Sequence, residues 1–370
     1  KDMTSCCPGP PTRPPRARAR TGSGEPVLVN VYIPLLVTAA LAVLAPPVAR
    51  RLPPRPAAWA LACAALVTAV GWAGSLALLA FTGVAQIPQI AAEGRWSVAA
   101  LRAEDPVYLV VAAGSTLVLA AGVVSLGVAA VGQGRRLVRS RRECALLPGA
   151  TELAVLDDDV PLAFALPGSP GRIVVSRGML RCLEDDQREA LLAHERAHLR
   201  GRHHVFQSVW RLTAALTPLL RPVAVAGDFV LERWADEEAA ERVGSREVVA
   251  HAVGRAALAS AGAARPAALA LTGGAVPQRV RALMAPPPAR RSLPLLAGGL
   301  LLAVCCGSLV NAASDSDRML DSAQWALCSA HAPADTAATV ARAGHDRDDE
   351  PGPDGCCVGR DHPEPTQRHL

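Results

Sequence analysis

Lysine is almost absent from this sequence. Lys1 is the only lysine among 370 residues. A Ser-x-x-Lys acyl-enzyme site and a Walker A phosphate-binding loop each need an internal lysine, so the sequence excludes both. The ten cysteines contain no Cys-x-x-Cys pair, which argues against a structural zinc ribbon. Internal repeats are also absent.

Apolar residues, in contrast, make up 51% of the chain and gather in long runs. A transmembrane helix needs about 20 such residues. Three runs reach that length, and a fourth is near the lower limit. The four runs are Val27–Val48, Ala57–Phe81, Val107–Val131 and Leu293–Val310. The sequence therefore predicts a multi-pass protein of the cell membrane with four transmembrane helices in contact with the lipid bilayer.

Arginines beside these runs indicate the orientation, because positive residues favour the cytoplasmic side. Eight lie on the side of the first loop and of the segment after the third run: Arg50, Arg51, Arg55, Arg135, Arg136, Arg139, Arg141 and Arg142. Six lie on the other side: Arg13, Arg16, Arg18, Arg20, Arg95 and Arg102. The balance predicts an outside N-terminus and a cytoplasmic domain after the third span. The cluster at 135–142 could instead bind nucleic acid, but its position directly after a span favours anchoring, so we expect no nucleic-acid partner.

The stretch His194-Glu195-Arg196-Ala197-His198 has the H-E-x-x-H pattern of zinc hydrolases. Positions i and i+4 share one face of a helix, so both histidines can reach one metal ion, and Glu195 can act as general base toward the attacking water. The run Gln187–Arg200 is rich in helix formers, with Asp186 and Glu189 arranged as in a capping box. The alternative is a charged helix that carries two histidines by chance.

A catalytic zinc site usually has a third protein ligand. Glu232 is our candidate. Asp236 would share its helix face, where it could accept an N–H from a ligand histidine and fix the orientation of that ring. The alternative is a solvated acidic face, because Glu237, Glu238 and Glu241 follow.

Other polar residues have less specific patterns. We expect His203 and His204 to be cations at the end of the motif helix rather than ligands. His251 lies in an apolar helix and is expected to be structural. The group that would stabilise the transition-state oxyanion stays open, with Arg233, Arg242 and His251 as candidates.

A further apolar stretch, Val209–Val225, lies between His198 and Glu232. One full crossing would carry the chain about 30 Å and would put these two side chains on opposite sides of the membrane. We therefore expect a shallow hairpin, or a helix lying on the bilayer or on the protein.

The segment after the third span is long enough for one domain. Patterns predict short strands at Glu152–Leu156, Leu162–Leu166 and Arg172–Ser176, and helices at the motif, at Asp228–Val243 before Gly244, and at Arg246–Ala261. The expected fold class is an α+β membrane protein, with four transmembrane helices and a mainly helical zincin-type domain that has a small sheet. The expected organisation is a disordered extension (1–26), three spans (27–131), a cytoplasmic zinc metallopeptidase domain (132–291), a fourth span (292–311) and a largely disordered tail (312–370).

The motif segments resemble integral-membrane gluzincins. His194 to His198, followed by Glu232-Arg-Trp-Ala-Asp236, is similar to their H-E-x-x-H and E-x-x-A-D patterns. Phe164 to Gly168 and Gly171 to Leu180 resemble the strands and glycine turn before their motif. Two branches fit: the BlaR/MecR-type signal-transducer peptidases, and the HtpX and CAAX prenyl protease branch. The resemblance implies one zinc ion per chain, held by the two histidines and Glu232, with Glu195 as general base.

The sequence therefore predicts a membrane zinc endopeptidase that hydrolyses peptide bonds with a zinc-activated water. Its partner would be a protein or peptide substrate. In the signal-transducing role that substrate is a repressor-like protein, and in an HtpX-type role it is a membrane protein removed by quality control. A non-catalytic membrane scaffold or receptor is the alternative from another class. The intact Glu195 argues against it, because a scaffold has no need of a base.

Overall fold

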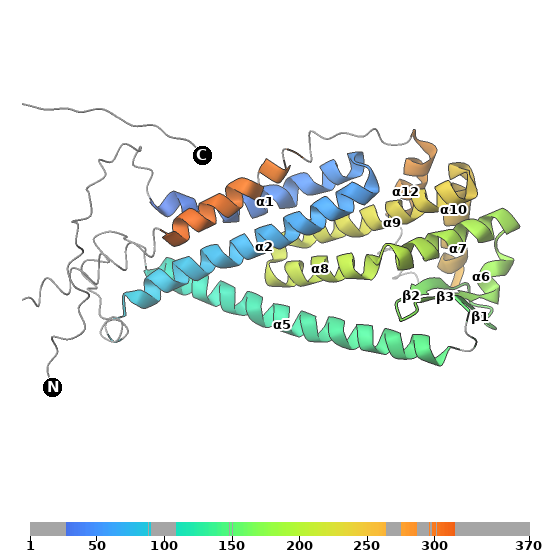
Figure 1. The fold of residues 1–370 in the computed structure, drawn as a ribbon, viewed down its shortest axis with the longest axis horizontal. Coiled ribbons are helices and arrows are strands. Elements are labelled where there is room, and N and C mark those ends of the chain that lie inside the picture. The colour runs from blue at the N-terminus through green and yellow to red at the C-terminus, as the bar shows by residue number, and fades with distance from the viewer. Residues whose placement is uncertain are drawn as a thin grey trace, which may run out of the picture.

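A computed structural model describes residues 27–87, 89, 109–147, 149, 151–263, 275–286, 296, 298–300 and 302–314 of the chain. The expected N-terminal extension and nearly all of the expected tail lie outside the described residues, as do parts of the expected fourth span. The described chain is mostly helical, with one three-stranded sheet (Figure 1).

Three helices are long and apolar enough to cross a membrane. They are α1 (Val27–Arg51), α2 (Pro54–Ala85) and α5 (Leu109–Leu146). α1 and α2 form a tight hairpin, and α5 runs from the far end of α2 toward the sheet (Figure 1). α5 continues without a break past residue 131, so the arginines at 135–142 lie on the same helix as the third candidate span.

The fourth expected span is only partly described. Its apolar helical stretch Gly298–Ser314 is shorter than the three candidate spans. The stretch packs beside α1 and α2, where Ala312 joins Val31 and Leu79 in one buried cluster. The described residues therefore show three helices of spanning length, and the fourth span stays a prediction.

The stretch between the motif and Glu232 is a helical hairpin. α8 (His203–Leu216) leads through the short 3-10 helix η2 (Pro218–Leu220) into α9 (Arg221–Val243). The hairpin lies along α1, α2 and α5, and the Leu216 carbonyl reaches the middle of α5 at Gly122 (Figure 1). α8 is about 20 Å long, and the hairpin packs on the protein, which is one of the arrangements that we expected. The chain thus returns to the side from which it came.

Small residues allow this close packing. The core shared by α1, α2, α8 and α9 has many buried alanines on α1 and α2, facing aromatic side chains such as Phe206 and Trp210. Alanine lets helix backbones approach closely, as in membrane bundles. Gly227 shows the effect at one position, because a Cβ there would lie 2.6 Å from the Trp210 ring.

The sheet lies at the other end of α5. Its strands are β1 (Leu153–Leu156), β2 (Ala163–Leu166) and β3 (Arg172–Ser176), in the order β1-β3-β2. β3 is parallel to β1 and antiparallel to β2. All three predicted strands are therefore confirmed, to within one residue at their starts. β3 is buried along its whole length and lies between the other two strands. β2 is therefore an edge strand of the sheet.

The motif helix α7 (Asp185–Arg200) follows the short helix α6 (Arg177–Arg181). Its cap differs from our expectation. The capping box pairs Glu184 with Gln187, not Asp186 with Glu189, and the Glu184 N–H donates to Gln187 Oε1 at 3.3 Å. α7 starts at Asp185, two residues before the expected start at Gln187, because Asp185 and Asp186 then lie in its first turn, where negative charge is favoured.

Two more helices close the domain. α10 (Arg246–Ala263) and α12 (Ala275–Met284) pack on α7 and α9. Gly244 ends α9 in the left-handed conformation (φ 80°), as the sequence predicted. In the described part, the fold is therefore a helical membrane bundle joined to a mainly helical domain with a small sheet.

Candidate metal centre and active site

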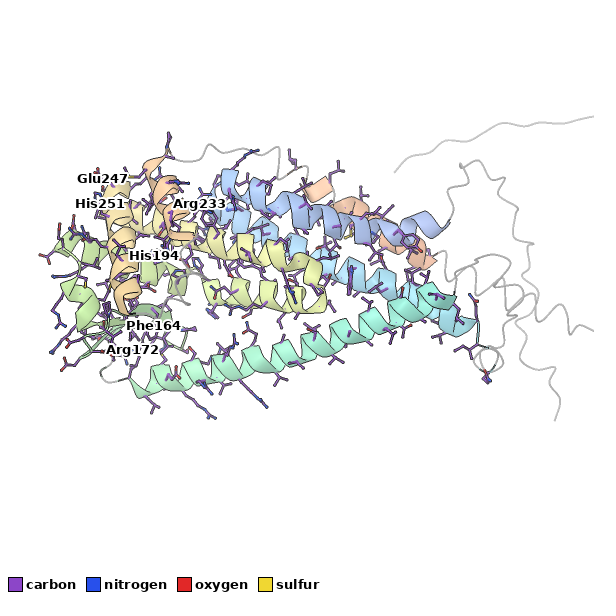
Figure 2. All side chains as sticks on the ribbon, turned by 180° about the vertical axis from the view of Figure 1, so that it is seen from behind. Phe164, Arg172, His194, Arg233, Glu247 and His251 are labelled. Atoms are coloured by element: carbon purple, nitrogen blue, oxygen red, sulfur yellow. The ribbon has the colours of Figure 1, made fainter. Side chains whose placement is uncertain are left out.

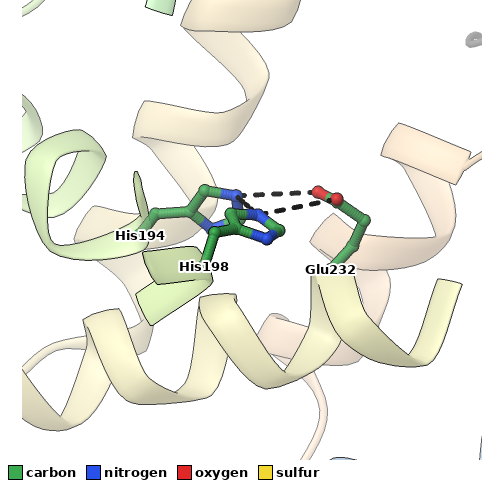
Figure 3. A group of neighbouring side chains, drawn as sticks. All are labelled: His194, His198 and Glu232. Carbon is green, nitrogen blue, oxygen red and sulfur yellow. Dashed lines mark hydrogen bonds and ion pairs between the residues drawn. The ribbon is translucent and has the colours of Figure 1, made fainter. Parts of the chain in front are cut away.

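Two helices bring the three predicted metal-ligand candidates together (Figure 3). His194 and His198 project from α7 and Glu232 projects from α9. The two histidine Nε2 atoms lie 3.1 Å apart, and each lies 3.6 Å from an oxygen of Glu232. Among the residues that the structure describes, they form the one group of three or more such side chains close enough to hold a metal ion.

These distances suit zinc. Tetrahedral zinc with bonds of 2.0–2.1 Å separates its ligand atoms by about 3.3 Å. The observed separations of 3.1 and 3.6 Å lie on either side of that value. Two imidazoles and one carboxylate also form a typical donor set of catalytic zinc sites, which leave a fourth position open. The residues present therefore fit a zinc ion.

Asp236 lies behind His194, one turn after Glu232 on α9. Its Oδ1 is 3.0 Å from His194 Nδ1, although the N–H is not aligned for a straight hydrogen bond. Asp236 is only 1% exposed. With Nδ1 beside a carboxylate, the Nε2 of His194 is directed toward His198 and Glu232.

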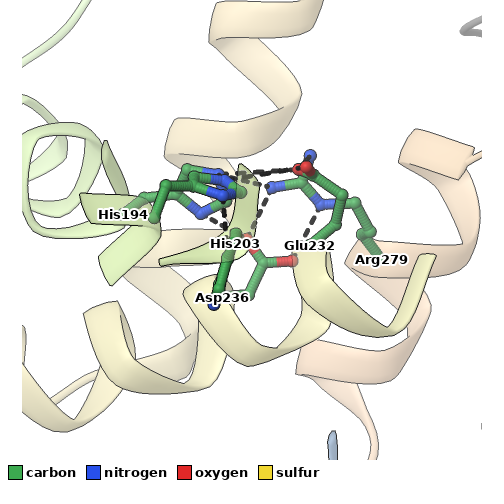
Figure 4. Close-up of polar contacts among 6 residues, drawn as sticks. His194, His203, Glu232, Asp236 and Arg279 are labelled. Atoms are coloured by element: carbon green, nitrogen blue, oxygen red, sulfur yellow. Dashed lines mark hydrogen bonds and ion pairs between the residues drawn. The ribbon is translucent and has the colours of Figure 1, made fainter. Parts of the chain in front are cut away.

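Arg279 from α12 also lies in the site, and the sequence analysis missed it (Figure 4). Its guanidinium contacts both oxygens of Asp236 at 2.6 and 2.8 Å and Glu232 at 2.8 Å. It also lies 3.5 Å from His194 Nε2. The sequence pointed to such a residue only indirectly, because Glu232 and Asp236 share one helix face and two neighbouring carboxylates in a folded protein need a cation nearby.

His203 has a different place from the one that we expected. α7 ends at Arg200 and His203 starts α8, so it is not a cation at the end of the motif helix. The side chain is buried, with Nδ1 2.8 Å from His198 Nδ1. Burial, and then the nearby His198, lower the pKa of His203 to about 3, so the ring is neutral. The same prediction is wrong for His204, whose pKa is lowered by burial and by Arg141.

Charge in the site is balanced. Burial alone would lower the pKa of His194, but contacts with Asp236 and Glu232 outweigh it and raise that pKa to about 10. Burial and the neighbouring His194 lower the pKa of His198 to about 4. Burial would raise the pKa of both carboxylates, yet His194 and Arg279 hold them below their usual range. Two carboxylates thus face one imidazolium and one guanidinium.

Glu195 lines the same pocket. This cavity of about 680 Å³ lies between β2, α7, α10 and α12, and holds the two motif histidines and Arg279 on its wall. Burial raises the pKa of Glu195, while a hydrogen bond from the Ala165 backbone acts in the opposite direction. The pKa of Glu195 is therefore above that of an exposed glutamate.

The edge strand β2 forms another wall. Ser176 N–H donates to the Leu162 carbonyl at 2.9 Å. Because antiparallel pairs alternate, the backbone groups of Ala163 and Ala165 then face away from β3. Both alanines line the pocket, so the strand edge is directed toward Glu195.

The three residues considered for oxyanion stabilisation lie elsewhere, and Figure 2 labels two of them, Arg233 and His251. Arg233 donates to the Arg50 carbonyl at the end of α1, Arg242 lines a separate polar pocket, and His251 is exposed on the outer side of α10. None of them lines the pocket that holds His194.

Comparison with known proteins fits this geometry. Residues 133–257 match the model of Peptidase family M48. Over 54 residues the chain is also 48% identical to the protease HtpX homolog of Thermoplasma acidophilum, an alignment that covers 14% of this chain and 17% of that protein. The chain thus spans about a sixth of the length of this curated relative. No solved structure matches the chain.

Over these residues the chain is similar to M48 peptidases and to an HtpX homolog, and it also has three helices that are apolar and long enough to cross a membrane. The two matches bear out the HtpX branch of the resemblance in part. The BlaR/MecR branch stays a prediction.

Proposed function

We propose that the protein is an integral-membrane, zinc-dependent endopeptidase. The observation that carries the proposal is the convergence of His194, His198 and Glu232 at separations that suit zinc, in a pocket that also holds Glu195 and a strand edge. The M48 match supports the same reaction class.

One zinc ion per chain would be held by His194, His198 and Glu232. Bound zinc would polarise the scissile carbonyl and make the attacking water more acidic. Glu195 takes a proton from that water and returns it to the leaving amine. Burial raises the pKa of Glu195, which makes the side chain a stronger base toward that water.

Three side chains would position the ligands. Asp236 holds His194 through Nδ1, and His203 does the same for His198, whose Nδ1–H donates to the neutral ring behind it. Each nitrogen of Arg279 is directed to a carboxylate, so we assign it to fixing Glu232 and Asp236 in place.

The substrate would be a peptide segment in extended conformation. Ala163 offers its backbone N–H and carbonyl along the pocket wall. Ala165 offers its carbonyl, because its N–H donates to Glu195, and an added strand can pair with these groups. The exposed Phe164 on the same strand lies at the pocket, where it would contact substrate side chains.

Two biological roles suit this chemistry. One is regulated, signal-transducing cleavage of a repressor-like protein by a cytoplasmic active site. The other is quality control of membrane proteins, which the similarity to an HtpX homolog favours. The arginine balance supports the cytoplasmic placement in both cases. Cross-linking the Glu195→Gln protein to its bound substrate in cells would separate the roles, because one yields a soluble repressor and the other yields membrane proteins.

The decisive experiment measures zinc content and casein cleavage by the purified full-length protein in detergent. We expect Glu195→Gln to keep zinc and lose cleavage, and Glu232→Ala to lose zinc. Glu189→Gln and Glu241→Ala change exposed glutamates on the same two helices and serve as matched controls. Cleavage retained in Glu195→Gln would contradict its role as base. Zinc retained in Glu232→Ala would move the third ligand elsewhere. Wild-type protein that binds zinc and cleaves nothing would favour a scaffold.

A further inference from the structure

A second cavity, of about 660 Å³, lies between the first turns of α2 and the start of α8. We call it the α2–α8 groove. Three arginines line it: Arg55, Arg200 and Arg202. Glu238 lies 3.6 Å from Arg200, whereas neither Arg55 nor Arg202 has an acidic partner in the described part of the chain. The groove therefore carries excess positive charge.

Beyond the arginines, the lining becomes apolar. Trp59 and Leu66 on α2 are 57% and 47% exposed, and Val205 on α8 is 47% exposed. Phe206 is buried and contacts Trp59 edge to face, with ring centres 4.9 Å apart. Exposed apolar side chains on both walls of a groove mark a binding surface for an apolar group.

The charged and apolar parts follow the direction of a candidate span. From Arg55 to Leu66 the chain rises about 16 Å along α2, from the helix start into the apolar stretch. Trp59 lies between them, and tryptophan is enriched at the boundary between head groups and hydrocarbon. A ligand that fits this order has an anionic head and an apolar chain.

We propose that the α2–α8 groove binds one anionic phospholipid. Its head-group phosphate lies among Arg55, Arg200 and Arg202, and one acyl chain lies along Leu66 and Val205. Basic pockets between membrane helices bind anionic head groups in this way. A soluble phosphate would use only the arginines and would leave the apolar walls uncovered. The proposal is independent of the peptidase activity.

Cys63 provides a direct test, because it is an exposed free thiol in the groove. The full-length protein in detergent is treated with N-ethylmaleimide, with dioleoyl phosphatidylglycerol, dioleoyl phosphatidylcholine or inorganic phosphate present. Alkylation is followed for each peptide by mass spectrometry. Phosphatidylglycerol at ten times its Kd should slow the reaction of Cys63 by roughly tenfold. Phosphatidylcholine and phosphate should have little effect. Cys182, exposed after α6, is the internal control and should react at one rate throughout.

Matched variants test the arginines. The double variant Arg55→Gln, Arg202→Gln should lose the protection of Cys63 by phosphatidylglycerol. The variant Arg136→Gln, Arg139→Gln removes the same charge from exposed positions on α5 and should keep the protection. Equal protection by both lipids, protection by phosphate alone, or equal loss in both variants would overturn the proposal. Cys144 is buried, so a Cys144 that stays unreactive in the variants shows that they are folded.

Discussion

His203→Phe removes one hydrogen-bonding group from behind His198 and keeps a ring against Trp234, whose centre lies 4.7 Å from that of His203. The Nδ1 atoms of the two histidines are 2.8 Å apart, and His203 is 1% exposed, so water cannot replace the lost partner. Loss of a group that orients a metal ligand typically costs 10–100-fold in metal affinity. We therefore expect zinc binding to weaken by about 1.4–2.7 kcal/mol.

The assay is competition for zinc between the purified protein and a chelating dye. His203→Asn offers an oxygen that can accept from His198 Nδ1–H and should keep most of the affinity. His204→Phe changes the adjacent histidine, which the motif does not contact, and serves as the control. Zinc affinity equal to wild type in His203→Phe would refute the reasoning. So would an equal loss in His203→Asn, because packing would then explain the effect.

Three further predictions follow from contacts in the structure. Arg279→Gln leaves the buried Asp236 and the partly exposed Glu232 without their cation. Loss of the buried pair costs about 3–5 kcal/mol, so the thermal midpoint of the zinc-free protein should fall; an unchanged midpoint would contradict this. The pKa of His194, about 10, is above its ordinary 6.5, so its proton stabilises the metal-free protein fully below pH 6.5 and this contribution is lost as pH rises through about 10. Zinc has to displace that proton, so the apparent affinity of the protein for zinc should rise by up to about tenfold per pH unit between pH 6.5 and about 10. A zinc affinity that stays constant over this range, after correction for the pH dependence of the chelator, would argue against the prediction. Gly227→Ala would press a methyl group on the Trp210 ring and should destabilise the folded protein by about 1–3 kcal/mol. Gly254→Ala has open space around the new methyl group and should be neutral or stabilising. Thermal unfolding compares the two variants, and equal shifts of their midpoints would disprove the packing argument.

Local patterns predicted the elements that carry the site. The i, i+4 spacing placed His194 and His198 on one helix face, and the structure has both on α7. Alternating and apolar residues predicted the three strands, and Gly244 predicted the end of α9. These features depend on neighbours within a few residues, so periodicity and capping residues are sufficient to predict them.

The surroundings of the ligands could not be predicted in that way. The helix start at Asp185 and the start of a new helix at His203 depend on competing caps, which a pattern does not rank. Arg279 is distant in sequence from both carboxylates that it contacts, and no spacing rule connects a residue on α12 to the face of α9. Its place depends on how α10 and α12 pack on α7 and α9.

The sequence by itself determined the apolar helices, the H-E-x-x-H helix and the requirement that the stretch between His198 and Glu232 return to its starting side. That last point follows from length alone, because a single crossing is longer than any metal–ligand distance. Only the tertiary structure decided how the return is made: a helical hairpin packed on alanine-rich helices. It also decided which groups support the ligands, because a buried charge or imidazole is held by whatever neighbours the packing brings within about 3 Å.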